Sequence, residues 1–223
     1  MFANKFFCVK GKHIIGLVLI LLVIDQALKF YIKTNYFLGE EHAILGNWGR
    51  LHFVENPGMA WGWKFGGEWG KIILTLFRLV AAFVGVWYIA KFVKQQMHWG
   101  FLTACALIYA GAVGNLIDSI FYGQIFEASD PYLQNVAKLV PFGAGYAKLL
   151  QGHVVDMFYF PLIQIEKLPS WVPFWGGEEF EFFRPVFNFA DACISVGVGA
   201  MLIWQKKFFP EDKKPEITSP EQG

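Results

Sequence analysis

The run HIIGLVLILLVIDQALKFYIK, residues 13–33, decides the fold class of this chain. A helix that crosses a bilayer needs roughly 20 mainly apolar residues, which this run supplies. Asp25 and Lys29 interrupt its second half, one helical turn apart. Because a charge inside a span costs about 3 kcal/mol or more, an acid at this depth indicates a functional site unless a partner neutralises it.

Three further runs have the length and composition of membrane spans: 71–93, 100–122 and 187–208. Hydrophobic residues make up 55% of the 223 residues and aromatic residues 18%, and the mean hydropathy is +0.39. These values indicate an integral membrane protein. The length suits a single domain over 1–223, and a net charge of +1 without a basic stripe argues against nucleic-acid binding.

The lysines predict how the spans are oriented. They cluster before the first span, between the second and third, and after the fourth, at Lys5, Lys10, Lys12, Lys91, Lys94, Lys206, Lys207, Lys213 and Lys214. Because basic residues in short flanks mark the cytoplasmic side, both termini are expected inside. Segments 34–70 and 123–186 then face outward, and the polar tail from about 210 is expected to be disordered.

Two other acids occupy apolar runs near the expected outer side. Asp118 lies toward the end of the third span and Asp191 opens the fourth, and each follows an asparagine by three residues, Asn115 and Asn188. On a helix this spacing places amide and carboxylate on one face. Together with Asp25, these residues predict a polar site at one membrane depth.

The segments between the spans hold a strand signal and a fourth acid. Residues around Leu51 to Glu55 have β-type composition and are followed by the turn Asn56-Pro57-Gly58, whereas Asp156 lies in GHVVDMFYF, an apolar strand-like or helical stretch. If Asp156 and Asp191 lie close together in a low dielectric, they share a proton, which suits general acid–base catalysis on water. The histidines lack zinc-site spacing, so no metal and no cofactor are expected.

Five ordered motifs carry a resemblance: DQALK (25–29), ENPGMAWG (55–62), GAVGNLID (111–118), GHVVDMF (152–158) and FNFADACI (187–194). They resemble the lipoprotein signal peptidases, or signal peptidase II. The resemblance implies an aspartic peptidase of the bacterial inner membrane, active toward the outer leaflet among membrane lipids. We expect it to be a monomer. It implies prolipoprotein substrates cut before a diacylglyceryl-modified cysteine. The implied fold is membrane α-helical, a four-transmembrane-helix bundle with a small extracytoplasmic β-cradle and a short interfacial helix.

The resemblance implies a role for each matching residue. The catalytic pair matches Asp156 and Asp191, and the substrate-binding or supporting positions match Asn56, Asn115, Asp118, Asn188, Asp25 and Lys29. The chain departs from the family pattern at Ser119, where an arginine is usual, and in an inserted segment at about 124–150. We expect that segment to pack on the membrane surface beside the site. Candidate replacements for the arginine are Lys138, Lys148 and Arg184.

Simpler interpretations stay open from the residues alone. Asp25 and Lys29 fit a charge pair that makes the span tolerable, Asn115 with Asp118 fits a clamp between helices, and Asp191 fits a helix N-cap. Asn56 fits a turn former, and Arg78 in the second span has no assigned role. An alternative function is a proton-coupled transporter, which also uses intramembrane acids but spreads them through the membrane depth.

Overall fold

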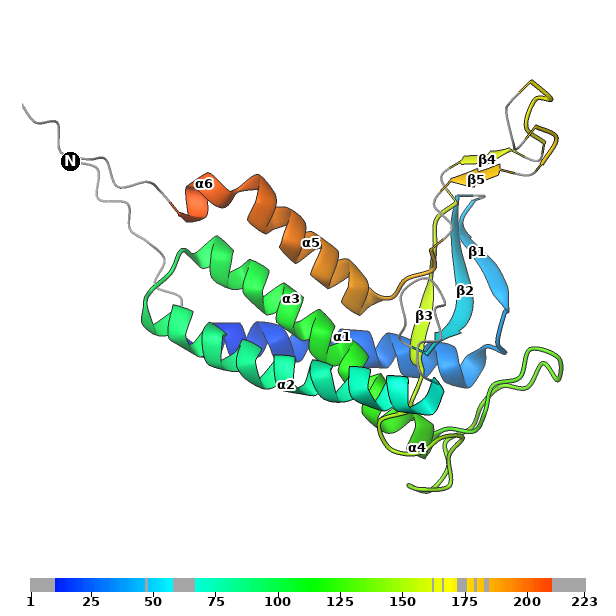
Figure 1. Ribbon diagram of the computed structural model, residues 1–223, viewed down its shortest axis with the longest axis horizontal. Helices are drawn as coiled ribbons and strands as arrows, with labels where there is room; N and C mark the ends of the chain where they lie inside the picture. The colour runs from blue at the N-terminus through cyan, green and yellow to red at the C-terminus, as the bar shows by residue number, and fades with distance from the viewer. Residues whose placement is uncertain are drawn as a thin grey trace, which may run out of the picture.

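The computed structural model describes residues 11–46, 48–57, 67–161, 163–165, 167–171, 176–178, 180–182 and 185–209. Its main body is a bundle of four long helical segments with a small sheet at one end (Figure 1). We call this the sheet end; the α2–α3 turn lies at the opposite end. The bundle helices are α1 (Gly11–Asn35), α2 (Gly67–Lys94), α3 (Trp99–Ile117) and α5 (Phe189–Ile203). The tail expected to be disordered, from about 210, lies outside the described residues.

Among the described residues, three helices are long and apolar enough to cross a membrane: Gly11–Asn35, Trp69–Lys94 and Trp99–Ile125. They include the expected spans 13–33, 71–93 and 100–122. The fourth expected span differs, because 187–208 is not one helix. Its α5 has 15 residues, or about 22 Å at 1.5 Å per residue, and the short α6 (Gln205–Phe208) follows Trp204. The Asn188 cap places the start of α5 at Phe189, and the helix ends at Ile203 before Trp204, so α5 alone is shorter than the roughly 30 Å hydrocarbon layer.

We call the four helical segments of the bundle tracks. The third track, which begins with α3, changes its winding where it reaches the sheet end. After α3 comes a π-helical turn, Asp118–Tyr122, and then α4 (Gly123–Ile125). Such turns often occur at functional sites because they re-aim side chains. Among the described residues every helical segment belongs to one of the four tracks, so the separate interfacial helix implied by the resemblance is not seen in that part of the chain.

The sheet has three antiparallel strands in the order β1 (Glu41–Leu45), β2 (Gly49–Asn56) and β3 (Val154–Tyr159). The strand expected around Leu51 to Glu55 is confirmed as part of β2, and Asp156 lies on a strand opposite Val54. A separate hairpin pairs β4 (Ile163–Ile165) with β5 (Phe180–Phe182). The three-stranded sheet therefore brings the segment after the first span next to the segment before the last.

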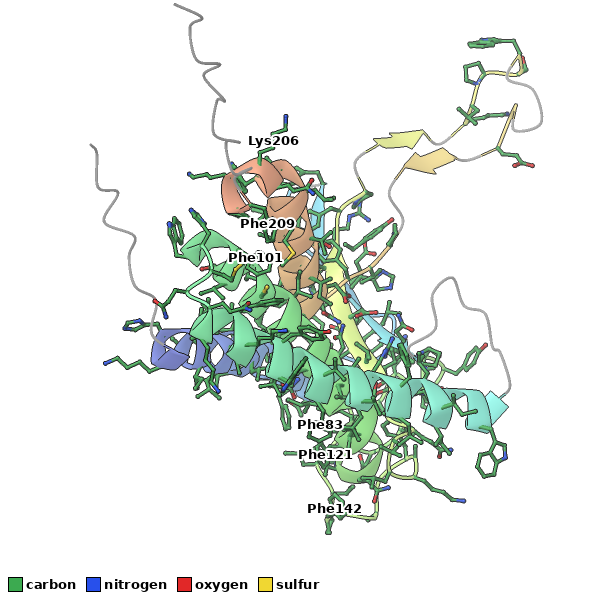
Figure 2. All side chains as sticks on the ribbon, turned by 60° about the vertical axis from the view of Figure 1, so that its left-hand side comes forward. Phe83, Phe101, Phe121, Phe142, Lys206 and Phe209 are labelled. Atoms are coloured by element: carbon green, nitrogen blue, oxygen red, sulfur yellow. The ribbon has the colours of Figure 1, made fainter. Side chains whose placement is uncertain are left out.

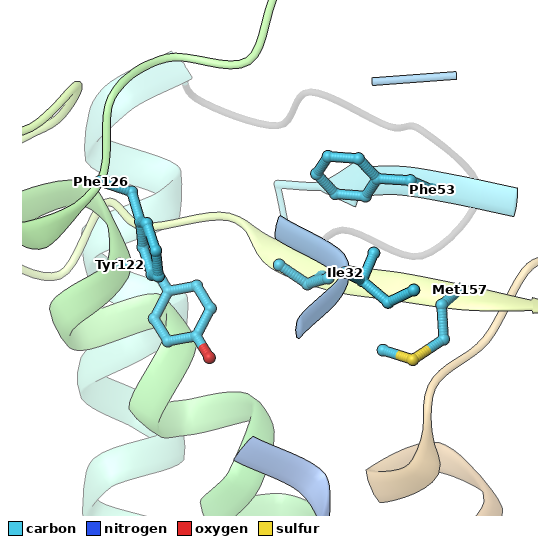
Figure 3. Packing of buried hydrophobic residues seen from close by; sticks show 6 residues of the cluster. Ile32, Phe53, Tyr122, Phe126 and Met157 are labelled. Atoms are coloured by element: carbon cyan, nitrogen blue, oxygen red, sulfur yellow. The ribbon is translucent and has the colours of Figure 1, made fainter. Parts of the chain in front are cut away.

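A buried apolar cluster joins the sheet to the helices. The cluster contains Ile32 of α1, Phe53 of β2, Tyr122 of the π-turn, Phe126 just after α4, and Met157 of β3 (Figure 3). A second cluster, around Phe101, Leu102 and Phe208, closes the opposite end. Since the first cluster uses residues from four parts of the chain, packing there fixes β3 and α1 relative to each other.

The bundle helices approach closely at two glycines. A Cβ on Gly111 would lie 2.3 Å from the Ala190 carbonyl oxygen, and a Cβ on Gly114 would lie 2.6 Å from Asp25 Oδ2. Real side chains cannot approach this closely, so α3 needs glycine where it meets α5 and α1. The close contact lets the polar residues of three helices reach one another.

The inserted segment folds back on the end of the third track. An antiparallel β-bridge joins Phe126 to Leu139. Further along, the segment is hydrogen-bonded to α4, where Ala147 N donates to Gly123 O at 2.8 Å. Several of its large apolar side chains stay exposed, including Tyr132 at 94%. Phe142, labelled in Figure 2, is 67% exposed. The insertion is thus an ordered excursion with an apolar outer surface.

Candidate active site

Asp156 occupies a buried position on the central part of β3. Its side chain accepts a hydrogen bond from Asn188 Nδ2 at 2.6 Å and another from Asn56, whose strand β2 pairs with β3. The residue is only 3% exposed. Burial, followed by the nearby charge of Asp191, raises the pKa of Asp156 to about 7. A carboxyl group with this pKa holds a proton for much of the time at neutral pH.

Asp191 lies in the first turn of α5, but it is not the N-cap as the simpler interpretation expects. The cap is Asn188, whose side chain accepts from Asp191 N at 2.9 Å, and Asp191 completes a capping box with the Asn188 backbone. Asn115 Nδ2 donates to Asp191 Oδ1 at 2.8 Å. Helix capping and the buried polar site thus use the same two residues.

Asn188 connects the two acids directly. The Asn188 side chain is completely buried. Its Nδ2 donates one hydrogen bond to Asp156 and another to Asn115 Oδ1 at 3.1 Å. The preceding residue, Phe187, pairs with Phe158 of β3, with a bond of 2.7 Å from Phe158 N to Phe187 O. Strand pairing and capping therefore bring Asp156 and Asp191 to one place, although 35 residues separate them.

Lys29 orders the polar residues beneath this pair. Its Nζ lies 2.9 Å from Asp25 Oδ2, 2.8 Å from Asp118 Oδ2 and 2.8 Å from Asn115 Oδ1, and the side chain is fully buried. The three protons of the ammonium group are thereby all used. Because Asn115 Oδ1 accepts from Lys29 and Asn188, the Asn115 amide nitrogen is the group that faces Asp191. The lysine therefore orients a residue that contacts the acid.

The remaining carboxylate oxygens of the Lys29 group are also satisfied. Ala190 N donates to Asp25 Oδ1 at 3.0 Å, and Gln26 Nε2 donates to Asp118 Oδ1 at 2.9 Å. Both acids are buried, so these bonds offset part of the free energy lost on leaving water. The predicted ion pair and the predicted clamp between helices both exist.

An elongated cavity of about 520 Å³ runs from this polar site between α2, α3 and α5. Arg78, Asn115 and Asp191 lie toward the sheet end of its walls, whereas Phe92, Cys105 and Met201 lie toward the other end. Between them the lining is mostly small or apolar, with Ala81, Ala82, Gly85, Ile108 and Ala112. The cavity can hold an apolar chain segment with one polar end.

The family model described as Signal peptidase (SPase) II matches residues 17–207 of this chain. The chain belongs to the signal peptidase II family. The lipoprotein signal peptidase of Porphyromonas gingivalis is 50% identical over 195 residues, which cover 87% of this chain and 83% of the relative. That of Amoebophilus asiaticus is 36% identical over 214 residues, or 93% of this chain and 80% of the relative. This signal peptidase II is therefore an aspartic peptidase that removes the signal peptide from prolipoproteins.

Solved structures support the same fold. A structure described as a bacterial membrane enzyme aligns with a TM-score of 0.56 and 21% identity, covering 97% of this chain and all of the other. A second of the same description gives a TM-score of 0.54 over 93% of this chain and 99% of the other. With its apolar helices, the peptidase is a membrane protein. The transporter alternative receives no support.

The structure joins all eight site residues predicted from the sequence into one bonded network. Asp25 and Asp118 are linked to the catalytic candidates through Lys29 and Asn115, and also through the backbone N–H groups of Ala190 and Val155. Sequence reasoning missed Gln26, which lies within the quoted DQALK motif. Ser119 is fully buried and donates to Asn115 O at 2.9 Å, so its hydroxyl belongs to the helix end. Arg184, one candidate for replacing the family arginine, lies outside the described residues.

A second polar cluster lies one turn further along α1. The sequence analysis did not predict it, although Glu55 and His153 belong to two of the quoted motifs. Lys33 Nζ contacts Glu55 of β2 and donates to Ser129 Oγ at 3.0 Å, while His153 Nδ1 lies 3.2 Å from Glu55 Oε2. Burial alone favours the neutral acid, but His153 and Lys33 outweigh it and hold the pKa of Glu55 below its ordinary value. This Lys33 cluster, defined as Lys33, Glu55, Ser129 and His153, ties the inserted segment to α1 and the sheet.

Proposed function

We propose that Asp156 and Asp191 are the catalytic pair of this peptidase and hydrolyse the scissile bond directly with water. The observation that carries the proposal is the buried Asp156, whose pKa is raised to about 7, beside a second acid that shares its partner Asn188. A pair of this kind holds one proton at neutral pH. Asn56, Asn115, Asn188, Asp118, Asp25 and Lys29 serve as supporting residues.

In this mechanism Asp191 is the base and Asp156 the acid. Asp191 removes a proton from water as the water oxygen bonds to the scissile carbonyl carbon. Asp156 then gives its proton to the leaving nitrogen as the carbon–nitrogen bond breaks. Asp191 is left protonated and Asp156 ionised, and transfer of one proton back through solvent resets the pair. Neither step needs a metal or a cofactor.

The substrate proposal is a prolipoprotein whose new N-terminal cysteine already carries diacylglycerol. The apolar cavity of about 520 Å³ suits residues of the signal peptide, and its polar end borders Asp191. A substrate approaching from the bilayer keeps its acyl chains in lipid, which avoids transferring them to water. Exposed α2 side chains such as Phe77 and Phe83, at 70% and 68%, suit a lipid-facing helix (Figure 2).

The proposed topology has four spans, counting α5 with α6, in the bacterial inner membrane. Both termini lie in the cytoplasm, and the sheet and inserted segment lie outside near the outer leaflet. The lysine distribution supports this orientation. The enzyme is proposed to act as a monomer, because all the network residues come from one chain.

Cleavage by the purified protein tests the proposal. Diacylglyceryl prolipoprotein should be cut, whereas the unlipidated precursor should be cut far more slowly. Asp156→Asn and Asp191→Asn should each lower kcat at least about 10³-fold while cooperative thermal unfolding shows that each variant is folded, since general acid–base catalysis contributes about 10²–10⁴. Asp130→Asn, in the inserted segment, is the matched control. Near-normal turnover by either dyad variant, or loss of activity with EDTA and its return with zinc, would refute the mechanism.

A further inference from the structure

Arg78 is a charge on a helix that is otherwise apolar. Its α2 neighbours Phe77 and Val80 are 70% and 61% exposed, as suits a lipid-facing surface, whereas Arg78 is only half-buried and lines the cavity. A charge within a span costs about 3 kcal/mol on insertion scales, and such residues commonly mark substrate pathways. The cavity that it lines leads to Asp191.

The cavity wall offers few groups that can bind a peptide backbone. Arg78 alone carries a positive charge among the described residues that line the cavity, and it interacts electrostatically with Asp191. Lys29 is fully buried and engaged by protein groups. Asn115 also has its amide nitrogen on Asp191 and its oxygen on Lys29 and Asn188.

A bound substrate needs hydrogen-bond donors at this point. For water to attack the scissile carbonyl, the chain around that bond must be extended, and its carbonyl oxygens then lose their helical partners. In an apolar cavity an unpaired carbonyl costs free energy on the order of 1–3 kcal/mol. A guanidinium group offers five N–H donors in a planar fork, which suits neighbouring carbonyl oxygens.

We propose that Arg78 binds the substrate backbone, its guanidinium group donating hydrogen bonds to carbonyl oxygens on the signal-peptide side of the scissile bond. This role rests on the proposed function of Asp156 and Asp191. Without substrate the guanidinium group is attracted toward Asp191, and the incoming peptide takes over its donors. Arg78 is thus a substrate-binding residue, and sequence reasoning left it unassigned because its partners lie on other helices.

Steady-state cleavage of a diacylglyceryl prolipoprotein by the full chain in detergent tests this role. Arg78→Gln should raise KM about tenfold while kcat changes less than threefold. Arg78→Lys, which keeps charge and donors without the fork, should recover most of the lost binding. The control is Lys91→Gln, on the same helix but over the Trp87 ring, which should match the unsubstituted enzyme. Thermal unfolding of each variant checks that it folds.

Three outcomes decide the matter. An unchanged KM in folded Arg78→Gln, while unsubstituted enzyme and Lys91→Gln cleave normally, overturns the role of Arg78 but leaves the proposed function intact. A shifted pH profile of kcat with unchanged KM also overturns it, because Arg78 would then act only on Asp191. No cleavage by the unsubstituted enzyme, in contrast, counts against the proposed function itself.

Discussion

Lys29 and Lys33 lie one turn apart on α1, both fully buried, yet the protein neutralises them differently. Lys29 meets two carboxylates from the helical bundle, Asp25 and Asp118, and an amide that continues to the catalytic candidates. Lys33 meets one carboxylate, from the sheet, and its Nζ lies 5.0 Å from the Tyr146 ring centre. One helix thus positions the catalytic candidates through Lys29 and holds the sheet and the inserted segment through Lys33.

Removing Lys29 should give the largest effect. Lys29→Met leaves two buried carboxylates without their cation, and breaking a buried ion pair in this way costs about 3–5 kcal/mol. Asn115 also loses the donor that sets its orientation, so kcat should fall about 100-fold or more. Chemical or thermal unfolding and cleavage rates measure the two effects.

A double variant separates charge from geometry at this position. Lys29→Met combined with Asp118→Asn removes one of the two stranded charges, so it should unfold at a higher temperature than Lys29→Met alone. Asp118→Asn by itself should be milder than either dyad substitution. If the double variant is less stable than the single one, the carboxylate charge is not what Lys29 compensates.

Removing Lys33 should affect stability more than catalysis. In Lys33→Met, Glu55 keeps its contacts with Ser129 and His153, so the expected loss is about 1–3 kcal/mol. The dyad network contains none of these residues, so kcat should stay within threefold of the unsubstituted enzyme. A loss of kcat as large as that of Lys29→Met would show that the two clusters act as one.

The same contrast explains what the sequence could predict. Asp25 and Lys29 are an i, i+4 pair, and the Asn–Asp spacings of Asn115 with Asp118 and Asn188 with Asp191 are equally local, so helical periodicity exposes them. Lys33 has Lys29 and Phe37 at i±4 and finds Glu55 22 residues away and Ser129 96 residues away. Such pairs depend on tertiary packing, and no local pattern reveals them.

The helical tracks and β2 followed from hydropathy and turn signals, but the interruption of the fourth span did not. The predicted span 187–208 passes through Trp204 and the polar Gln205-Lys206-Lys207 to Phe208, whereas the structure ends one helix at Ile203 and starts a second at Gln205. The π-turn at Asp118 is equally invisible in hydropathy. The partners of Asp156 depend on the pairing of β2 with β3 and on Phe187, contacts that strand propensity alone does not specify.

The contributions of Asp156 and Glu55 to stability should respond to pH with opposite sign. Asp156 has a raised pKa, so its stabilising contribution is present below its ordinary pKa and is lost as pH rises through about 7. Glu55 has a lowered pKa, so its contribution is present above its ordinary value and is lost as pH falls through the folded value. We expect Asp156→Asn to flatten the decline of Tm between about pH 4 and pH 7. Glu55→Gln should flatten the loss of Tm that occurs as the pH becomes acidic.

Catalysis should follow only the first of these titrations. Because Asp156 must carry a proton in the proposed mechanism, kcat/KM should fall above about pH 7 in the unsubstituted enzyme. Glu55→Gln should keep that alkaline limb. A limb that moves in Glu55→Gln would place the controlling group in the Lys33 cluster instead.

The smallest effect is expected at the tip of the inserted segment, which extends beyond Ser129 of the Lys33 cluster. Tyr132 and Leu133 are 94% and 75% exposed there, an arrangement that suits burial in lipid headgroups better than exposure to water. We expect Tyr132→Ser with Leu133→Ser to raise KM about twofold to threefold in bilayer nanodiscs, because the tip then holds the inserted segment less firmly against the membrane. In detergent micelles the same variant should behave normally. Gln134→Ser, at the adjacent residue, controls for loop disturbance, and an unchanged KM in nanodiscs would show that the tip does not support substrate binding through the bilayer.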